Sequence, residues 1–492
     1  MKNILIGLAL SILAFCNNAK GQNDIPTNKA VPSEKQIEYQ KMEVIGFIHF
    51  NMNTFTDKEW GYGNEDPKLF NPANLDADQW AKVAKEAGMK ELILTAKHHD
   101  GFCLWPSAYT KHSIKYSPYK NGKGDIVKEF VHACRKFGIK PGLYLSPWDR
   151  NDADYATAKY ITYYENQLRE LLTNYGEIDE VWFDGANGGD GYYGGANETR
   201  IIDRKTYYPW KQIWGIVHKL QPNSLIFSDA GPDIRWIGNE DGYASETSWS
   251  TLDADSIVPG TADPNYLNTG NPNGKEWVAG EADVSIRPGW FYHKSQDSVV
   301  KSPQELVDIY YKSAGRNAVM LLNVPPDRRG LMTDHDIRTL KAFRKILDET
   351  FQTNLAVGAK TVASNSRLNS PKFGPNNILD NNNNTYWATD DDKRNATIEV
   401  DLDSITEFDR IMLQEPIRFG QRISSFEIQI FKDNNWDTVA RGTTIGYKRL
   451  LRISPVRTDK VRIVIEDANN CPALSNFGLF KASQTEGWNG GS

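Results

Sequence analysis

The chain has 492 residues, of which 39% are hydrophobic and 24% charged, and its formal net charge is -6 at pH 7. This length exceeds one ordinary domain and suits a large α/β barrel followed by a smaller module. The mixed charges and the lack of a basic run argue against nucleic acid or an anionic membrane surface as a partner. The 14 Trp and 22 Tyr residues favour a carbohydrate-binding cleft, because sugar C–H groups stack on aromatic rings, although most of these rings are expected in the core.

The N-terminus has the pattern of an export signal. Lys2 precedes an apolar run over residues 4–15, which is too short to span a bilayer and typical of a signal-peptide core. Small residues at the cleavage spacing predict a signal peptide over residues 1–21 and a mature chain that is periplasmic or secreted. Cys16 leaves a lipid-anchored lipoprotein as the alternative, which we disfavour because a bulky Phe precedes it. The polar, aperiodic residues 22–36 predict a linker.

Apolar strand-like runs alternate with amphipathic helical segments from residue 44 onward. Strands are expected at residues 44–50, 91–97, 140–146, 180–184, 224–228, 234–239, 282–287 and 318–324. Helices are expected at residues 77–87, 125–137, 155–175, 207–220 and 303–315. This order predicts a parallel (β/α)8-like TIM barrel over residues 37–350. Residues 229–290 are rich in Gly, Pro, Asn and Asp, which predicts long loops over the barrel mouth.

The pattern changes after a predicted helix over residues 334–351. Short alternating runs follow at residues 397–402, 410–414, 425–431, 449–454 and 460–466. Clusters of Asn, Asp and Gly separate them, so residues 355–482 are predicted to form an all-β, jelly-roll sandwich. The tail from Gln484 onward is predicted to be disordered.

Polar and aromatic side chains stand at the C-terminal ends of four consecutive predicted strands. They are His49, His98 and His99, Tyr144, and Trp182 with Asp184. Packing alone does not predict this pattern, whereas the active sites of such barrels lie at this rim. A lone Asp-Gly pair has a simpler interpretation, in which Asp184 caps the next turn and Gly185 takes a positive φ angle. The four occupied strand ends favour a functional role for Asp184.

Metal, phosphate and serine chemistry are disfavoured. Adjacent residues on a strand point to opposite faces, so His98 and His99 could ligate one ion only if the backbone bent, and no third ligand follows at a recognisable spacing. The three cysteines beyond residue 100 also lack metal-ligand spacing, and their odd number indicates no disulfide framework. No phosphate loop or dinucleotide fingerprint follows the first strand, and no nucleophile elbow surrounds Ser146.

Carboxylate chemistry remains. Cleavage of a glycosidic bond needs one carboxylate at the anomeric centre and a second carboxyl group that protonates the leaving oxygen. Asp184 suits the first role. Candidates for the second are Glu240, Glu246 and Glu281, all in the loop-rich region. Glu240 is favoured because it ends a strand-like run, as Asp184 does, and because its aromatic neighbours would raise its pKa, as a general acid requires.

Five ordered motifs stand out between residues 37 and 345. They are residues 43–50 with Asn53-Thr54-Phe55, Glu59-Trp60-Gly61-Tyr62-Gly63, Lys97-His98-His99-Asp100-Gly101-Phe102, Gly142-Leu143-Tyr144 and Val181-Trp182-Phe183-Asp184-Gly185. Together they resemble the α-L-fucosidases of glycoside hydrolase family 29. The resemblance implies a (β/α)8-like barrel that hydrolyses α-L-fucosides with retention of configuration and without a catalytic cofactor. Its partners would be fucosylated oligosaccharides or glycoconjugates.

The resemblance also implies roles for single residues. Asp184 would be the nucleophile. The fucose would be surrounded by His49, Glu59, Trp60, His98, His99, Tyr144, Trp182 and Trp290. Residues 235–240, Arg-Trp-Ile-Gly-Asn-Glu, resemble a motif of the subgroup that prefers α-1,3/1,4-linked fucose on branched, Lewis-type glycans. In that subgroup the glutamate of the motif is the acid/base, and the resemblance implies the same role for Glu240. The Tyr- and Gly-rich residues 188–195 do not align with the family.

The second domain is similar to discoidin-type (coagulation factor 5/8 C-terminal) modules, on Asn377-Ile378-Leu379-Asp380 and Tyr386-Trp387-Ala388-Thr389. In related family 32 carbohydrate-binding modules the corresponding loop holds a structural calcium ion, for which Asp380, Asn382 and Thr385 offer oxygen ligands. The alternative is a simple turn in a domain that only braces the barrel.

Two other functions stay open at this point. One is a catalytically silent, fucose-binding lectin on the same scaffold, against which the intact carboxylates argue. The other is an exo-glycosidase of different sugar specificity, such as a galactosidase.

Overall fold

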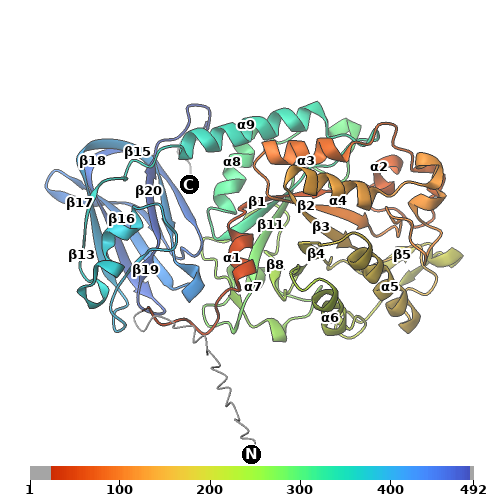
Figure 1. Ribbon diagram of the computed structural model, residues 1–492, viewed down its shortest axis with the longest axis horizontal. Coiled ribbons are helices and arrows are strands. Elements are labelled where there is room, and N and C mark those ends of the chain that lie inside the picture. Colours follow the sequence, from red (N-terminus) through yellow and green to blue (C-terminus); the bar gives the residue numbers. More distant parts are fainter. Residues whose placement is uncertain (1–23, 488–492) are drawn as a thin grey trace, which may run out of the picture.

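The computed structural model describes residues 24–487, so the predicted signal peptide and Cys16 lie outside the described part of the chain. Figure 1 shows a helix-ringed barrel beside an all-β domain. The predicted order of an α/β barrel followed by a β-sandwich is confirmed. Across residues 24–487, no helix is both long and apolar enough to cross a membrane.

Eight parallel strands close the barrel in the order β1-β12-β11-β8-β7-β4-β3-β2. Their bounds are β1 Val44–Ile48, β2 Glu91–Lys97, β3 Lys140–Leu145, β4 Glu180–Trp182, β7 Leu225–Ser228, β8 Ile234–Trp236, β11 Ala279–Ser285 and β12 Ala318–Asn323. Each overlaps a predicted strand. Apart from Lys140 and Trp236 every strand residue is buried, because helices cover the outside and side chains fill the inside.

Helices surround the barrel where the periodicity predicts them. They are α3 Ala77–Glu86, α4 Ile126–Phe137, α5 Ala158–Asn174, α6 Trp210–Leu220, α8 Pro303–Lys312 and α9 Asp334–Phe351. Asp76, Asp125 and Thr333 each accept a backbone N–H at a helix start, and Ser302 forms a capping box ahead of a proline. These local signals explain why the helix starts are predictable.

Short elements occur in the segments that connect the barrel strands. They are α2 Met52–Thr56, β5 Gly189–Gly191, β6 Glu198–Arg200, β9 Thr251–Leu252, α7 Pro264–Thr269 and β10 Glu276–Trp277. Residues 229–233 alone connect β7 to β8, without the usual helix. The predicted loops over residues 229–290 are therefore present. Glu240 of this stretch lines the cavity, whereas Ser250 and Trp277 bond Asn317 and Gln36, which precede β12 and β1 at the opposite end of the barrel.

The C-terminal domain consists of antiparallel strands in the order β13-β15-β18-β16-β17, with β20 paired to β15. The bounds are β13 Lys360–Ala363, β14 Trp387–Ala388, β15 Ala396–Gln414, β16 Ile423–Lys432, β17 Asn435–Gly442, β18 Arg449–Ala468, β19 Ala473–Leu474 and β20 Asn476–Phe480. β15 and β18 each cover two predicted strands. Register shifts near Asp401 and Phe408 bend them without ending them.

The predicted linker over residues 22–36 is wrong for its described part. Ser33 forms a capping box that starts α1 (Glu34–Gln40), and the residues before it run along the C-terminal domain. Ile25 is buried in a cluster with Tyr386, and the Arg422 guanidinium donates to the carbonyl of Pro26. A polar segment without periodicity of its own is ordered because a second domain supplies its partners.

The tail predicted to be disordered from Gln484 onward is anchored as far as the structure describes it. The buried carboxylate of Glu486 pairs with Arg410 over 2.9 Å and with Arg452 over 3.2 Å, both in the C-terminal domain. Thr350 of α9 donates to the other carboxylate oxygen over 3.3 Å. Glu486 therefore ties the end of α9 to the β domain.

The candidate calcium ligands gather on one turn of the C-terminal domain. The Thr385 hydroxyl donates to Asp380 Oδ2 over 2.6 Å, and the Asn382 N–H donates to Oδ1 over 2.9 Å. Arg418 donates to the carbonyl of Asn384 in the same turn over 2.9 Å. Oxygen donors of this kind suit calcium, although the turn already satisfies several of them itself. Calcium binding here stays a prediction.

We expect Glu486→Gln to lower the melting temperature of the protein clearly more than Glu407→Gln. The first substitution removes the buried carboxylate charge that Arg410 and Arg452 share, a loss on the order of 3 kcal/mol, although each arginine keeps a second carboxylate partner. Glu407 instead pairs with Lys481 at the surface, where water screens the pair. Scanning calorimetry of both variants measures the difference. Equal shifts would contradict the anchoring role of the tail.

Candidate active site

All ten residues predicted to form the site line one cavity at the C-terminal end of the barrel. They are His49, Glu59, Trp60, His98, His99, Tyr144, Trp182, Asp184, Glu240 and Trp290, and the lining is completed by Phe47, Ala186 and Asp283. These residues come from six barrel strands or the segments after them. Closure of the barrel brings them together from distant parts of the sequence.

Neutral donors hold the carboxylate of Asp184, just beyond the end of β4. The Tyr144 hydroxyl donates to Oδ2 over 2.9 Å, and the N–H of Ala186 donates to Oδ1 over 2.6 Å. Burial raises the pKa of Asp184, and these two bonds oppose the rise. Asp184 thus caps its turn and also faces the cavity. The expected positive φ at Gly185 is wrong; a side chain there would collide with the Asp229 carboxylate.

Three histidines line the cavity as neutral imidazoles. Burial lowers the pKa of His49 and of His99 to about 3, and that of His98 well below its usual value. The expectation that His98 and His99 point to opposite faces is wrong, because β2 ends at Lys97 and the two ring centroids lie 4.1 Å apart. Within residues 24–487, no three His, Cys, Asp or Glu side chains are arranged to hold a metal ion.

A hydrogen bond behind His49 sets which ring nitrogen faces the cavity. The amide nitrogen of Asn323 donates to Ser285 Oγ over 2.9 Å and to the Trp290 carbonyl over 2.8 Å. Asn323 Oδ1 must then accept the proton of His49 Nδ1, which lies 2.9 Å away. Nε2 of His49 is therefore the unprotonated nitrogen.

The same reasoning applies to the other two rings. Ser146 donates its hydroxyl proton to the Trp148 carbonyl over 2.7 Å, so Ser146 Oγ accepts from His99 Nδ1 over 2.7 Å. Nε2 of His99 is unprotonated as a result. The Asn53 amide nitrogen lies 3.3 Å from His98 Nδ1 and donates to it, which places the His98 proton on Nε2. The rings thus offer one donor and two acceptors.

The floor of the cavity is aromatic. Trp182 stacks on Phe227, with centroids 4.1 Å apart and an interplanar angle of 7°, and on Tyr144, with centroids 5.3 Å apart. Tyr144 and Phe227 stand in register on the strands either side of Trp182, so the three rings form a continuous apolar wall in which the faces of Trp182 are covered.

Two of the three candidate acids lie away from the cavity. Glu281 is fully buried inside the barrel, where it accepts from the Tyr39 hydroxyl over 2.5 Å and from Trp182 Nε1 over 2.8 Å. Glu246 pairs with two arginines, one from each domain. Glu240 is the member of the three that lines the cavity.

Glu240 stands at the open mouth, on the loop after β8. Trp290 Nε1 donates to its Oε2 over 3.0 Å. Partial burial raises the pKa of Glu240, the Trp290 bond opposes the rise, and the charge of Asp184 adds to it. Trp236 Nε1 donates to the carbonyl of Asn239 over 3.1 Å, so an indole from β8 anchors the residue before Glu240.

Glu59 and Trp60 complete the rim from the loop after β1. Glu59 accepts from the backbone N–H of Trp290 over 2.9 Å and from His293 Nε2 over 2.6 Å, which joins two rim loops. Trp60 is 54% exposed and packs edge-on against Trp148, whose ring centroid lies 5.6 Å away. An exposed indole at a cavity mouth is available for contact with a ligand.

Residues 188–195, which do not align with the family, form β5 and the first part of the turn that joins it to β6 in one hairpin. Tyr193 in this hairpin accepts from Trp148 Nε1 over 3.0 Å and donates to the Gly189 carbonyl over 2.8 Å. Because Trp148 packs against Trp60, the hairpin braces one wall of the mouth.

Sequence reasoning missed two acids of the rim. Asp283 lies on β11 and lines the cavity. Asp229 follows β7 and accepts the N–H of Gly260 over 2.9 Å; burial and the charge of Asp184 raise the pKa of Asp229 to about 6. Inspecting the ends of all eight predicted strands, rather than the first four, would have found Asp229, which directly follows the strand predicted at residues 224–228. Asp283 lies near the start of the strand predicted at residues 282–287 and carries no such signal.

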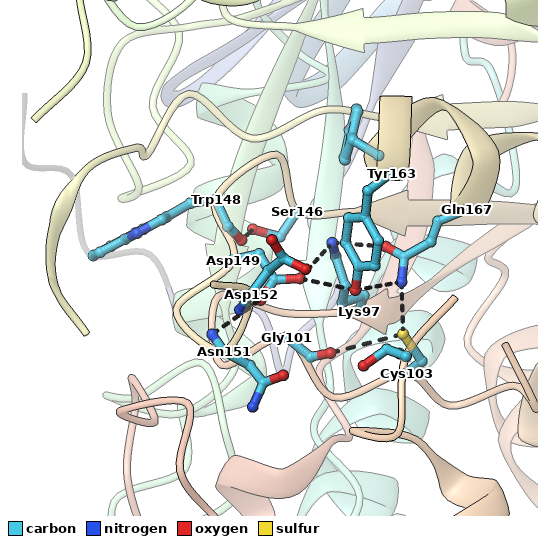
Figure 2. A network of polar contacts seen from close by, with 12 residues as sticks. Lys97, Gly101, Cys103, Ser146, Trp148, Asp149, Asn151, Asp152, Tyr163 and Gln167 are labelled. Carbon is cyan, nitrogen blue, oxygen red and sulfur yellow. Dashed lines mark hydrogen bonds and ion pairs between the residues drawn. The ribbon is translucent and has the colours of Figure 1, made fainter. Parts of the chain in front are cut away.

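A buried polar network supports the rim from behind (Figure 2). Lys97 is fully buried, and its Nζ donates to Asp149 Oδ2 over 3.1 Å and to Gln167 Oε1 over 2.9 Å. Asp149 in turn accepts backbone N–H groups of its own loop. This loop follows β3 and carries Ser146 and Trp148, so the network fixes the residues that orient His99 and the mouth.

Comparisons relate the chain to known proteins. A family model described as Alpha-L-fucosidase matches residues 25–351, and one described as F5/8 type C domain matches residues 360–477. Alpha-L-fucosidase 1 of Arabidopsis thaliana is 43% identical over 455 residues, which cover 92% of this chain and 87% of that protein. A solved glycoside hydrolase family 29 fucosidase of Ruminococcus gnavus, in complex with fucose, superposes with a TM-score of 0.85 at 34% identity, covering 96% of this chain and 99% of that one. The crystal structure of a glycoside hydrolase 29 family member from an unknown rumen bacterium superposes with a TM-score of 0.83 at 44% identity, and the match covers 94% of this chain and 78% of that one.

We expect the three cavity histidines to stay neutral between about pH 5 and 8. Imidazole nitrogen NMR should show the Nδ1–H form for His49 and His99 and the Nε2–H form for His98. Their folded pKa values lie below the unfolded value of about 6.5, so on acidification the unfolded chain binds protons that the folded chain does not, and stability falls from that pH downward. Protonation of His99 near pH 6 would contradict this bonding.

Proposed function

Since the chain belongs to the α-L-fucosidase family, glycoside hydrolase family 29, we propose that it releases terminal fucose by double displacement, with Asp184 as nucleophile and Glu240 as acid/base. The observation that supports this most is that the two carboxyl groups line one cavity in different settings. Asp184 is bonded by an O–H and an N–H, whereas Glu240 stands at the mouth, where the leaving group departs.

In the first step a carboxylate oxygen of Asp184 attacks C1 of the fucose. The bond from C1 to the aglycone oxygen breaks, and Glu240 transfers its proton to that oxygen. The Tyr144 hydroxyl and the Ala186 N–H keep Asp184 oriented, and their effect on its pKa favours the ionised form that attack requires. A covalent fucosyl ester on Asp184 results.

In the second step Glu240 acts as a base. It takes a proton from a water molecule, whose oxygen attacks C1 and releases the Asp184 carboxylate. The raised pKa of Glu240 suits a group that must hold a proton in one step and accept it in the next. The Trp290 N–H keeps the carboxyl group in place through both steps.

The remaining groups suit recognition of the sugar ring. The unprotonated Nε2 atoms of His49 and His99 accept hydroxyl protons, and Nε2–H of His98 donates to a hydroxyl oxygen. The aromatic lining of Phe47, Tyr144 and Trp182 offers apolar contact for the C–H groups of the sugar. This mixture of donors, acceptors and apolar lining matches a deoxy-hexose with three hydroxyl groups.

We extend the proposal to the linkage. Residues 235–240 resemble the subgroup that prefers α-1,3/1,4-linked fucose on branched, Lewis-type glycans. Arg235 is fully buried and donates to the carbonyls of Trp249 and Leu267 over 2.7 Å each, so it ties the segment after Glu240 to β8. A branched aglycone would meet this segment.

We expect Asp184→Ala to lose on the order of 10⁴-fold or more in kcat on every fucoside. Azide should restore turnover in Asp184→Gly and give a fucosyl azide of inverted configuration, because the azide then replaces the missing carboxylate. The azide product is identified by NMR. Substantial hydrolysis by Asp184→Ala would exclude Asp184 as the nucleophile.

We expect Glu240→Gln to distinguish natural glycans from aryl fucosides. Loss of a general acid lowers kcat/KM about 10²- to 10⁴-fold when the leaving group needs a proton, and far less when the leaving group is a nitrophenolate. In the unmutated enzyme kcat/KM should fall at alkaline pH as Glu240 deprotonates, and this alkaline limb of the pH profile should be absent in Glu240→Gln. Asp241→Asn, which changes a neighbouring carboxylate outside the cavity lining, is the matched control. Equal losses on both substrate types would contradict the acid role.

The linkage proposal predicts that Lewis-type trisaccharides are cleaved faster than 2-fucosylated lactose. Digestion of both at equal concentration, followed by chromatography of free fucose, measures the ratio. Equal rates would contradict the preference and leave the fucosidase activity intact. The same preparation is tested on aryl galactosides, and hydrolysis of these in place of fucosides would favour the alternative of a different sugar specificity. Tight binding of fucose without turnover of any fucoside by the unmutated protein would favour the lectin.

A further inference from the structure

Asp283 is a cavity residue to which the proposed mechanism gives no role. It lies on β11, is 4% exposed and lines the same cavity as Asp184 and Glu240. Its Oδ1 accepts a hydrogen bond from Trp236 Nε1 over 2.8 Å. Within residues 24–487 no other residue hydrogen-bonds to its Oδ2, and that atom is not among the polar atoms sealed inside the protein. Oδ2 is therefore open to the cavity.

The surroundings of Asp283 favour its neutral form. Burial raises the pKa of Asp283 well above its usual value, and the charges of Glu240 and Glu281 add to the rise. None of the described residues that line the cavity is Lys or Arg, so no cation there opposes it. On the adjoining strand β12 the residue in register is the apolar Leu321.

The Trp236 bond favours one position for the Asp283 proton. Oδ1 accepts the indole N–H, a role that suits the carbonyl oxygen of the acid, so we assign the proton to Oδ2. No described residue bonds to Oδ2, so a ligand in the cavity is the acceptor available to this hydroxyl. A sugar hydroxyl can accept this bond while giving its own proton to an unprotonated imidazole nitrogen, as His49 and His99 present.

We propose that Asp283 binds the substrate directly, donating a hydrogen bond from its carboxylic acid group to a hydroxyl of the fucose ring. This inference rests on the proposed function, in which the cavity holds the fucose. It gives Asp283 a task different from those of Asp184, which reacts at C1, and of Glu240, which serves the leaving oxygen.

A second role for Asp283 must be separated from this one. Trp236 Nε1 contacts both Asp283 Oδ1 and the carbonyl of Asn239, the residue before Glu240. Asp283 is thereby connected to the acid/base as a positioning residue. In kcat/KM, which reports the steps up to formation of the fucosyl ester, loss of positioning would matter only where the leaving group needs a proton, whereas loss of a sugar contact would matter for every fucoside.

The experiment compares Asp283→Asn with Asp283→Leu, two substitutions of similar size, on a nitrophenyl fucoside and on a fucosylated oligosaccharide. Asparagine can accept from Trp236 and donate from its Nδ2, so we expect kcat/KM within about threefold of the unmutated enzyme. Leucine removes both bonds, and we expect a loss of roughly ten- to hundredfold on both substrates. A loss confined to the oligosaccharide, an equal loss with asparagine, or no loss with leucine would each overturn the proposal.

Fucose affinity in an Asp184→Ala background supplies a readout without turnover. Calorimetry should show binding about tenfold weaker with Asp283→Leu and unchanged with Asp283→Asn or with the control Asp241→Asn. Retained affinity in the leucine variant would overturn the contact. Failure of the proposed mechanism would appear separately, as continued hydrolysis by Asp184→Ala itself. If the leucine variant does not fold, a loss of kcat/KM with Asp283→Asn on both substrates would still overturn the proposal.

Discussion

Neutral hydrogen-bond donors hold the negative charge in this cavity, because none of the described residues that line it is Lys or Arg. The carboxylate of Asp184 is bonded by the hydroxyl of Tyr144 and an amide N–H rather than by an ion pair. Burial then raises the pKa values of the neighbouring acids Glu240 and Asp283, since each further negative charge would be uncompensated. The protonation states that glycoside hydrolysis needs follow from this single constraint.

Buried positive charges lie outside the cavity lining, on segments that lead to it. Lys97 pairs with Asp149 and directly precedes two histidines of the lining. Arg287 pairs with Asp336 and lies three positions before Trp290 of the lining. Arg235 lies five positions before Glu240 and donates to the carbonyls of Trp249 and Leu267. Two of these cations are therefore paired with buried carboxylates and the third is held by backbone carbonyls, so none of them places its charge in the cavity lining.

The parts of the molecule that could be predicted carry local signals. The barrel strands and outer helices follow from periodicity and caps, and the rim residues follow from strand ends and ordered motifs. The N-terminal segment around Ile25 and the tail at Glu486 could not be predicted, because their partners lie in the other domain. Asp283 was missed because an aspartate inside a strand is normally read as facing solvent, and only barrel closure shows that it faces the cavity. The bulges that keep β15 continuous depend on backbone register, which side-chain alternation does not report.

The arginine pair around Glu246 has a consequence for how such enzymes diversify. Glu246 lies six positions after Glu240 and is bonded to Arg316 of the barrel and Arg449 of the β domain. The segment that follows Glu240 is thus attached to the seam between the domains. Recombination that exchanges the β domain would remove Arg449 and with it one of the two ion pairs that hold this segment. We therefore regard the two domains as one inherited unit rather than as independent modules.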